Sequence, residues 1–232
     1  MEQFVLEVWG DFACFTRPET KVERFSYPVM TPSAARGVLD AIYVKPLEFC
    51  WRVEKIEVLN PIKFIPLKRN EVKDRIPGIS DSIMKKGGEF QLIIADDAGD
   101  DVDDKKGRTQ RQTIALKNVR YRIHAHIELR KGFETQRKSI EQQAKRRISQ
   151  GKCYYQPYFG CREFAAYFEF AEDEKPTNGE NLDIGFMVYD VYNLDEVIID
   201  NAPPFISLFK AELKKGVLEI PHWDSELVKK PM

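Results

Sequence analysis

Two histidines at alternating positions are the residues of this chain best suited to chemistry. His124 and His126 lie in the segment 118–130, NVRYRIHAHIELR, where apolar and polar residues alternate. Such alternation predicts a β-strand with one face on a core, so the two imidazoles would stand side by side on the polar face. Histidine exchanges a proton near neutral pH, and the neighbouring Arg120 and Arg122 could hold a phosphate through their planar guanidinium groups. The segment indicates a surface for acid–base chemistry at a phosphodiester, although a solvated strand face would show the same pattern.

RNA is the substrate that would use such a pair best, because an RNA strand carries its own nucleophile, the 2′-hydroxyl. One neutral imidazole could take the proton of that hydroxyl, and one protonated imidazole could give a proton to the departing 5′-oxygen. The His-x-His spacing also occurs among metal ligands, so a metal site is an alternative. The third histidine, His222, is distant in sequence and has no Cys or His pair beside it. We therefore expect no metal and no cofactor.

The charges of the chain are segregated, although the net charge of its 232 residues is only −1. Residues 105–152 carry fifteen lysines and arginines against three acids, a local charge of +12. Residues 163–200 carry eleven acids against one lysine, a local charge of −10. A basic middle is typical of proteins that bind a polyanion, and the acidic part could dock a protein partner. The cations expected to hold RNA are Arg120, Arg122, Lys131, Arg137, Lys138, Lys145, Arg146, Arg147 and Arg162.

Hydrophobic periodicity predicts the elements that would position these residues. Thr31 and Pro32 suit the N-cap and the first position of a helix that should end at Lys45-Pro46. A second helix is expected at 135–150, where cations surround a thin apolar stripe and Thr135 is a possible N-cap. Alternating patterns predict strands at 3–9, 47–64, 119–129, 164–170, 184–192 and 217–220. We expect 164–170 and 184–192 to be joined as a hairpin. An irregular insertion is expected at about 66–112, with a short strand at 90–95 inside it.

The order of these elements favours an α+β fold. Strand, helix, strand, insertion, strand, helix and strand make two β-α-β halves, which is the ferredoxin-like plan of RNA-recognition (RRM and RAMP) domains. Such domains bind RNA on the sheet face that their helices leave open. We expect a ferredoxin-like domain at 1–160 and a small antiparallel β domain at 161–232, with the polar side of 119–129 on the open face.

The composition favours a globular intracellular protein. With 43% hydrophobic residues, the chain can bury a substantial core. Its four cysteines form no CxxC pair, and the N-terminal MEQFVLEVWG leads into a strand and does not resemble a signal peptide. No apolar run approaches the roughly 20 residues that a membrane-spanning helix needs. We expect a cytoplasmic protein with reduced thiols and no membrane contact.

Four stretches, in this order and spacing, resemble a known family. They are the opening FVLEVWGDFACFTRPETKVERFSYPV, the helix TPSAARGVLDAIYVKP, the strand VRYRIHAHIEL and the later YFGCREF. Over most of residues 4–192 the chain resembles the type I-C CRISPR-associated endoribonuclease (Dvulg subtype) of the RAMP group. The resemblance implies metal-independent cutting of the CRISPR repeat transcript at the base of a hairpin. It also implies that the protein stays on its product as a subunit of the type I-C interference complex.

The active site of that family is similar to a set of one tyrosine, one lysine and one histidine. The tyrosine maps onto Tyr43 in AIYVKP and the histidine onto His126, while the lysine position holds His124 in this chain. The resemblance therefore implies Tyr43, His124 and His126 as catalytic residues, with Tyr43 bonding to the 2′-hydroxyl or the phosphate. A different class of function is also open, a non-catalytic subunit that holds the 5′ end of a guide RNA.

Overall fold

The chain forms two compact units in a computed structural model that describes residues 2–20, 22–73, 78, 81–87, 107–171, 175–197 and 204–231. The larger unit holds Met1–Ile65 and Ile114–Met232, and the smaller holds Pro66–Thr113. The smaller unit spans nearly the same residues as the insertion expected at 66–112. Because the candidate catalytic residues all lie in the larger unit, its architecture decides how they are placed.

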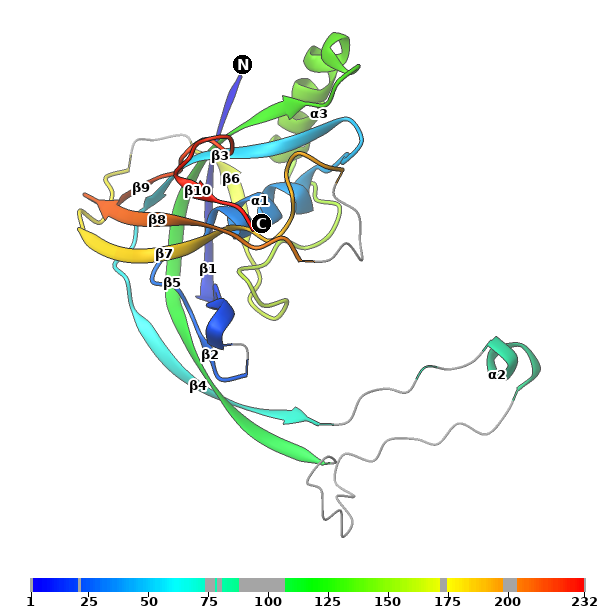
Figure 1. Ribbon diagram of the computed structural model, residues 1–232, viewed down its shortest axis with the longest axis vertical. Helices are drawn as coiled ribbons and strands as arrows, with labels where there is room; N and C mark the ends of the chain where they lie inside the picture. The colour runs from blue at the N-terminus through cyan, green and yellow to red at the C-terminus, as the bar shows by residue number, and fades with distance from the viewer. Residues whose placement is uncertain are drawn as a thin grey trace. The chain divides into compact units, whose positions relative to one another are not determined.

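Strands outnumber helices along the chain (Figure 1). The order is β1 (Gln3–Ala13), η1 (Pro18–Thr20), β2 (Arg24–Phe25), α1 (Pro32–Ile42), β3 (Phe49–Val58), β4 (Phe64–Val72), α2 (Asp81–Lys86), β5 (Arg108–Leu129), η2 (Glu134–Gln136), α3 (Arg137–Ser149), β6 (Tyr167–Phe170), β7 (Leu182–Asp190), β8 (Ser207–Lys214), β9 (Val217–Glu219) and β10 (Val228–Lys229). The fold is a mixed α/β fold dominated by an antiparallel sheet, which confirms the expected α+β class at this level. Within the described ranges, no helix has the length and apolar character that crossing a bilayer requires.

An antiparallel sheet forms the centre of the larger unit, in the order β10-β8-β9-β3-β5-β1-β6. β5 lies between β1 and β3, so Ile123 has Leu6 opposite it on one side and Ile56 on the other. These three side chains are fully buried, as are Ala125 and Ile127 further along β5. The apolar half of the alternating segment 119–129 therefore lies in the core, as the period of two predicts.

α1 begins where the sequence predicts but ends at Ile42, before the predicted end at Lys45-Pro46. The Thr31 side chain accepts a hydrogen bond from the Ala34 N–H at 3.2 Å, and Pro32 is the first helical residue. The chain becomes extended at Tyr43, just before Lys45-Pro46. The helix packs on β3 and β7, and its buried residues lie along one side of it. The local signals of the sequence therefore fix the start of α1, whereas Tyr43 leaves the helix before the predicted stop.

α3 confirms the second predicted helix, although its beginning differs. Ile140, Ala144 and Ile148 are buried, so the thin apolar stripe is the side that packs against the rest of the unit. α3 contacts both β6 and α1. The expected cap at Thr135 is wrong, because this residue lies in the short 3-10 turn η2 and Gln136 precedes α3 without a side-chain cap bond. The exposed cations Lys138, Lys145 and Arg146 consequently lie on the outer side of the helix.

Two strand predictions had different outcomes. The segments 164–170 and 184–192 are not partners in a hairpin, because β6 pairs with β1 and β7 pairs with β8. Alternation identifies a strand but not its neighbour, and the polar loop between them leads from one edge of the sheet to the other. The strand at 217–220 is confirmed as β9. It follows β8 through a tight turn in which Lys215 and Gly216 have φ angles of 52° and 75°. The strand expected at 90–95 lies outside the described residues.

The residues expected to form a C-terminal domain continue the same sheet. β9 pairs with β3, and β8 and β10 extend the sheet beyond it. That residues 161–232 form a domain of their own stays a prediction.

In the smaller unit, β4 pairs with β5, and Arg111 Nε lies 3.2 Å from Glu71 Oε2 across the pair.

Candidate active site

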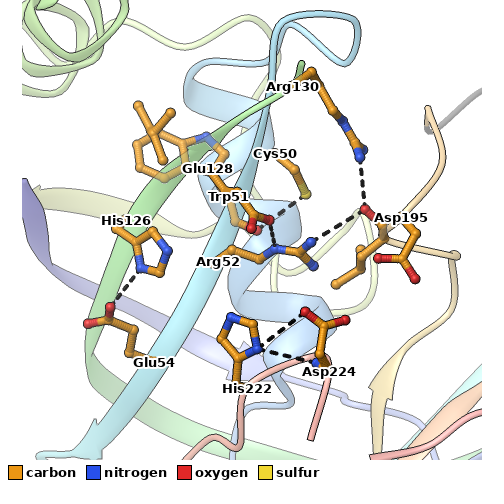
Figure 2. A network of polar contacts seen from close by, with 12 residues as sticks. Cys50, Trp51, Arg52, Glu54, His126, Glu128, Arg130, Asp195, His222 and Asp224 are labelled. Carbon is orange, nitrogen blue, oxygen red and sulfur yellow. Dashed lines mark hydrogen bonds and ion pairs between the residues drawn. The ribbon is translucent and has the colours of Figure 1, made fainter. Parts of the chain in front are cut away.

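His126 is joined to a carboxylate that the sequence patterns do not single out. The register of β3 against β5 shifts between Val53 and Lys55, so Glu54 is the extra residue of a β-bulge. His126 Nδ1 lies 2.6 Å from Glu54 Oε1, and Figure 2 shows the two side chains turned toward each other. Gln3 Nε2 donates to the other Glu54 oxygen at 2.7 Å. The carboxylate is held from two sides and can orient the imidazole.

This contact assigns the two ring nitrogens of His126 different roles. An ionised carboxylate only accepts hydrogen bonds, so in the neutral ring Nδ1 carries the proton and Nε2 keeps a lone pair. The His126 side chain is 14% exposed and the Glu54 side chain is 41% exposed, so solvent and substrate can reach the pair. A base oriented by a second group is the arrangement that acid–base catalysis uses. We call His126 and Glu54 the His–Glu dyad.

His124 lies one pleat away in different surroundings. Its side chain is 11% exposed, and its Nε2 lies 3.0 Å from Glu57 Oε1 without hydrogen-bond geometry. Glu57 also receives Arg122 at 2.5 Å and Lys55 at 2.8 Å. Burial lowers the pKa of His124, and Lys55 adds to the effect, so this imidazole is neutral at neutral pH. Burial would raise the pKa of Glu57, but its cationic neighbours outweigh burial and hold that pKa below its usual range.

The polar face of β5 is covered in its middle, which corrects the expectation of an open face for RNA. Arg122 and His124 are both buried. Glu7 binds Arg120 and also the Lys175 ammonium at 2.8 Å, and the Lys175 carbonyl accepts from Arg122 at 3.2 Å. The reason is that β1 and β3 bring glutamates to this face, where they neutralise the arginines of β5. Arg120 and Arg122 thus hold neighbouring strands together.

Tyr43 is not brought together with the two imidazoles. Its ring packs on Phe49, with centroids 5.1 Å apart. Phe49 belongs to the apolar face of the sheet, whereas His126 belongs to the polar face. Burial raises the pKa of the Tyr43 hydroxyl, and the nearby Lys45 and Arg147 oppose that rise. The phenol therefore lies beside Lys45, which also pairs with Glu48 at 2.9 Å, on the helical side of the sheet and on the opposite face from the dyad.

The remaining cations expected to bind RNA divide into two groups. Those that are exposed to solvent are Lys131, Lys138, Lys145, Arg146 and Arg162, of which Lys145 pairs with Glu2. Arg137 and Arg147 instead donate to the backbone carbonyls of Ile127 and Ile42, at 3.4 and 2.7 Å. The exposed group lies mainly on the outer side of α3. We call it the α3 cation surface, and it is available to a polyanion.

Sequence reasoning missed Glu54 and Lys45. Glu54 faces His126 only because of the bulge, and no pattern in the sequence marks the bulge. Lys45 stands two residues after Tyr43 in an extended segment, a spacing that places it on the same side of the chain and could have indicated it.

Among the residues that the structure describes, no group of three or more His, Cys, Asp or Glu side chains could hold a metal ion.

Comparison with known proteins decides the family. Residues 4–221 match the family described as CRISPR-associated protein (Cas_Cas5), in its Cas5d form. This chain belongs to the Cas5d family. A relative from Mannheimia succiniciproducens named CRISPR pre-crRNA endoribonuclease Cas5d is 39% identical, over 97% of either chain. A relative of the same name from Thermus thermophilus is 36% identical, over 95% of this chain and 92% of its own.

Solved structures show that the fold of this Cas5d-family chain is an established one. A CRISPR-associated protein has a TM-score of 0.64 at 20% identity, and the match covers 98% of this chain and 96% of that one. A functionally uncharacterized protein from Streptococcus mutans has a TM-score of 0.62 at 20% identity, with 98% and 97% covered. These likenesses show that the chain has the same overall fold as the two structures.

Proposed function

We propose that this Cas5d-family protein is an endoribonuclease that cuts CRISPR repeat transcripts at the base of a hairpin. Two relatives named CRISPR pre-crRNA endoribonuclease Cas5d are similar to it along nearly their whole length. The observation that carries the proposal is the His–Glu dyad, in which His126 Nδ1 lies 2.6 Å from Glu54. The substrate supplies the nucleophile, so the proposed route needs no metal ion and no cofactor.

In the proposed mechanism, His126 Nε2 takes the proton of the 2′-hydroxyl. The 2′-oxygen then bonds to the adjacent phosphorus, and the bond between phosphorus and the 5′-oxygen breaks. The 5′-oxygen leaves with a proton from water, and the hydroxide that remains takes the proton back from the His126 imidazolium. One RNA end then carries a 2′,3′-cyclic phosphate and the other a 5′-hydroxyl. Glu54 keeps the ring oriented and stabilises the imidazolium that forms.

Tyr43 and His124 have separate roles in this proposal. The Tyr43 hydroxyl, with Lys45 and Arg147 near it, binds phosphate on the helical side of the sheet. His124 is neutral and sits against Glu57, so it positions the polar face behind His126 and does not donate the proton. The α3 cation surface holds the hairpin stem by its phosphates, because contacts between cations and phosphates supply most of the sequence-independent affinity for RNA.

A second candidate function is a subunit that binds the 5′ end of a guide RNA without cutting it. The separation of Tyr43 and His126 onto opposite faces of the sheet favours this candidate. The neutralisation of Arg120 and Arg122 by glutamates also favours it, because these arginines would otherwise stabilise the charge that develops at the phosphate. The two functions share a binding surface and differ in their products.

A labelled repeat hairpin incubated with the protein in EDTA separates them. We expect one cut at the base of the hairpin, with a cyclic phosphate on the upstream fragment. A hairpin that is bound and stays intact would support the binding-only function. A cut that appears only after a divalent cation is restored would overturn the proposed mechanism.

Partners and domain plan belong to the same proposal. The antiparallel order β3-β5-β1-β6, with α1 and α3 as the two connections, supports a ferredoxin-like unit. β7 to β10 then make up the small C-terminal β domain. We propose that the protein stays on its RNA in the cytoplasm and joins the other subunits of the type I-C interference complex, with the acidic stretch 163–200 facing a partner.

A further inference from the structure

A large cavity opens beside α1 in the larger unit, away from the His–Glu dyad. Its volume is about 1040 Å³, at the top of the range of roughly 300–1,000 Å³ that small-molecule sites occupy. α1, the segment 14–18 that follows β1, the segment 154–160 and the end of β7 contribute to its walls. Neither His126 nor Glu54 lines it. The cavity is thus a separate feature from the proposed cutting site.

Four tyrosines are among the residues that line this cavity. Tyr154, Tyr155, Tyr158 and Tyr192 all contribute to it. Tyr154 is 77% exposed and Tyr155 is 45% exposed, so both rings have faces open to a ligand. Their centroids are 6.1 Å apart, and the ring planes are inclined by 75°. Exposed aromatic faces are the surfaces on which proteins stack unpaired nucleobases, whatever the base.

Three arginines and the carboxylate of Asp40 accompany the tyrosines. Arg130 lines the cavity and donates to the carbonyls of Leu194, at 3.0 Å, and Glu196. These partners are backbone carbonyls, and within the described ranges Arg130 takes part in no ion pair with a carboxylate. Arg17 also lines the cavity, with its guanidinium 4.7 Å from the centre of the Tyr27 ring and 3.8 Å from the carboxylate of the exposed Glu19. Cations beside stacking rings fit a ligand that combines bases with phosphates.

The wall formed by α1 is held by an ion pair and contains a glycine inside the helix. Arg36 donates to both carboxylate oxygens of Asp190, at 2.7 and 2.9 Å, and so fastens α1 to the end of β7. Gly37 lies inside α1 and lines the cavity, and a Cβ added there would meet nothing within 4 Å. Glycine weakens a helix, and packing within the described chain does not require it here. A ligand that approaches the helix backbone closely would require it.

We propose that this tyrosine cavity binds unpaired nucleotides of RNA. The rings of Tyr154 and Tyr155 stack on bases, Arg130 and Arg17 neutralise phosphates, and Gly37 leaves room against the helix. The proposal rests on the proposed function in so far as RNA is the ligand, and it adds a contact to single-stranded RNA next to the hairpin that the α3 cation surface holds.

Fluorescence anisotropy with a labelled, unstructured hexauridylate tests RNA binding by the cavity separately from cutting, because this RNA has no hairpin to be cut. We expect the wild-type protein to bind it at low salt. The double variant Tyr154→Ala/Tyr155→Ala should bind at least about tenfold more weakly, as expected for the loss of stacking on at least one base. Gly37→Leu, which fills the cavity from the helix, should weaken binding to a similar degree. Tyr167→Ala is the matched control, because Tyr167 is an exposed tyrosine of β6 outside the cavity.

The outcomes separate this inference from the proposed function. Failure of the wild-type protein to bind the hexamer, or affinities within twofold of wild type in both cavity variants, would overturn the inference, even if the repeat hairpin were still cut. Loss of hexamer binding in the cavity variants supports the inference, even if the hairpin were never cut. Photocrosslinking of a hexamer containing 5-iodouridine should attach RNA to Tyr154 or Tyr155. Adducts found only on α3 would place the single strand elsewhere and contradict the inference.

Discussion

Replacing Glu54 by glutamine tests how the His–Glu dyad works. Glu54→Gln keeps the shape of the side chain and can keep the contact with Gln3. It removes the negative charge that orients His126 and stabilises the imidazolium. We therefore expect the rate of hairpin cutting to fall while the affinity for the hairpin stays the same, because Glu54 acts on the base and not on the bound RNA.

The size of the effect follows from the contact itself. A hydrogen bond to a charged group contributes about 1.5–3 kcal/mol when it is sheltered. The Glu54 side chain is 41% exposed, so solvent screening reduces the contribution to about 1–2 kcal/mol. Since 1.36 kcal/mol corresponds to a factor of ten in rate, Glu54→Gln should slow the reaction roughly 5- to 30-fold.

Single-turnover cutting of a labelled repeat hairpin, with protein in excess, measures that rate directly. Glu128→Gln is the matched control, because Glu128 is 40% exposed and pairs with Arg52 on the same face of the sheet (Figure 2). The control should cut at the wild-type rate. A Glu54→Gln protein as fast as wild type, or one slowed no more than the control, would refute the assigned role of Glu54.

Three further predictions concern stability. Burial depresses the pKa of His124 below its ordinary 6.5, so the folded protein prefers the neutral ring. This stabilisation of the folded state is complete above about pH 6.5 and is lost as the pH falls. Thermal melting should therefore show that the wild-type protein loses more stability between pH 7 and pH 5 than His124→Gln does. Gly37→Ala adds a Cβ that meets nothing and should raise the melting temperature by about 1–4 °C in a thermal scan. Gly160→Ala combines a φ of +79° with a Cβ placed 2.0 Å from the Cys14 carbonyl oxygen, so urea unfolding should show a loss of at least about 2 kcal/mol.

Local patterns in the sequence predicted the elements well. The alternation of 119–129 depends on a period of two that any half-buried strand must show, and β5 follows it. The cap at Thr31 depends on backbone chemistry within a few residues, so the start of α1 was also predictable. The helix ends at Ile42, before the stop expected at Lys45-Pro46, so its end was not. The strands that β6 and β7 pair with were not predictable, because the pairing depends on contacts between residues far apart in the chain.

The candidate site was predictable only in part. His126 was identified from its residue type and spacing, and it does face a group that can tune it. Glu54 reaches it through a bulge, which is a property of two paired strands and not of either sequence alone. The burial of Arg122 and His124 depends on glutamates from β1 and β3 and on the segment at Lys175, so a polar strand face gave no sign that it would be covered.

The rate at which His126→Ala cuts a repeat hairpin, measured in EDTA beside its affinity for the same hairpin, tests the central claim most directly. General base catalysis contributes about 10²- to 10⁴-fold. We predict a loss of that size in the single-turnover rate, with a hairpin Kd within about twofold of wild type. A variant that cuts at the wild-type rate would contradict the assignment of His126 as the base.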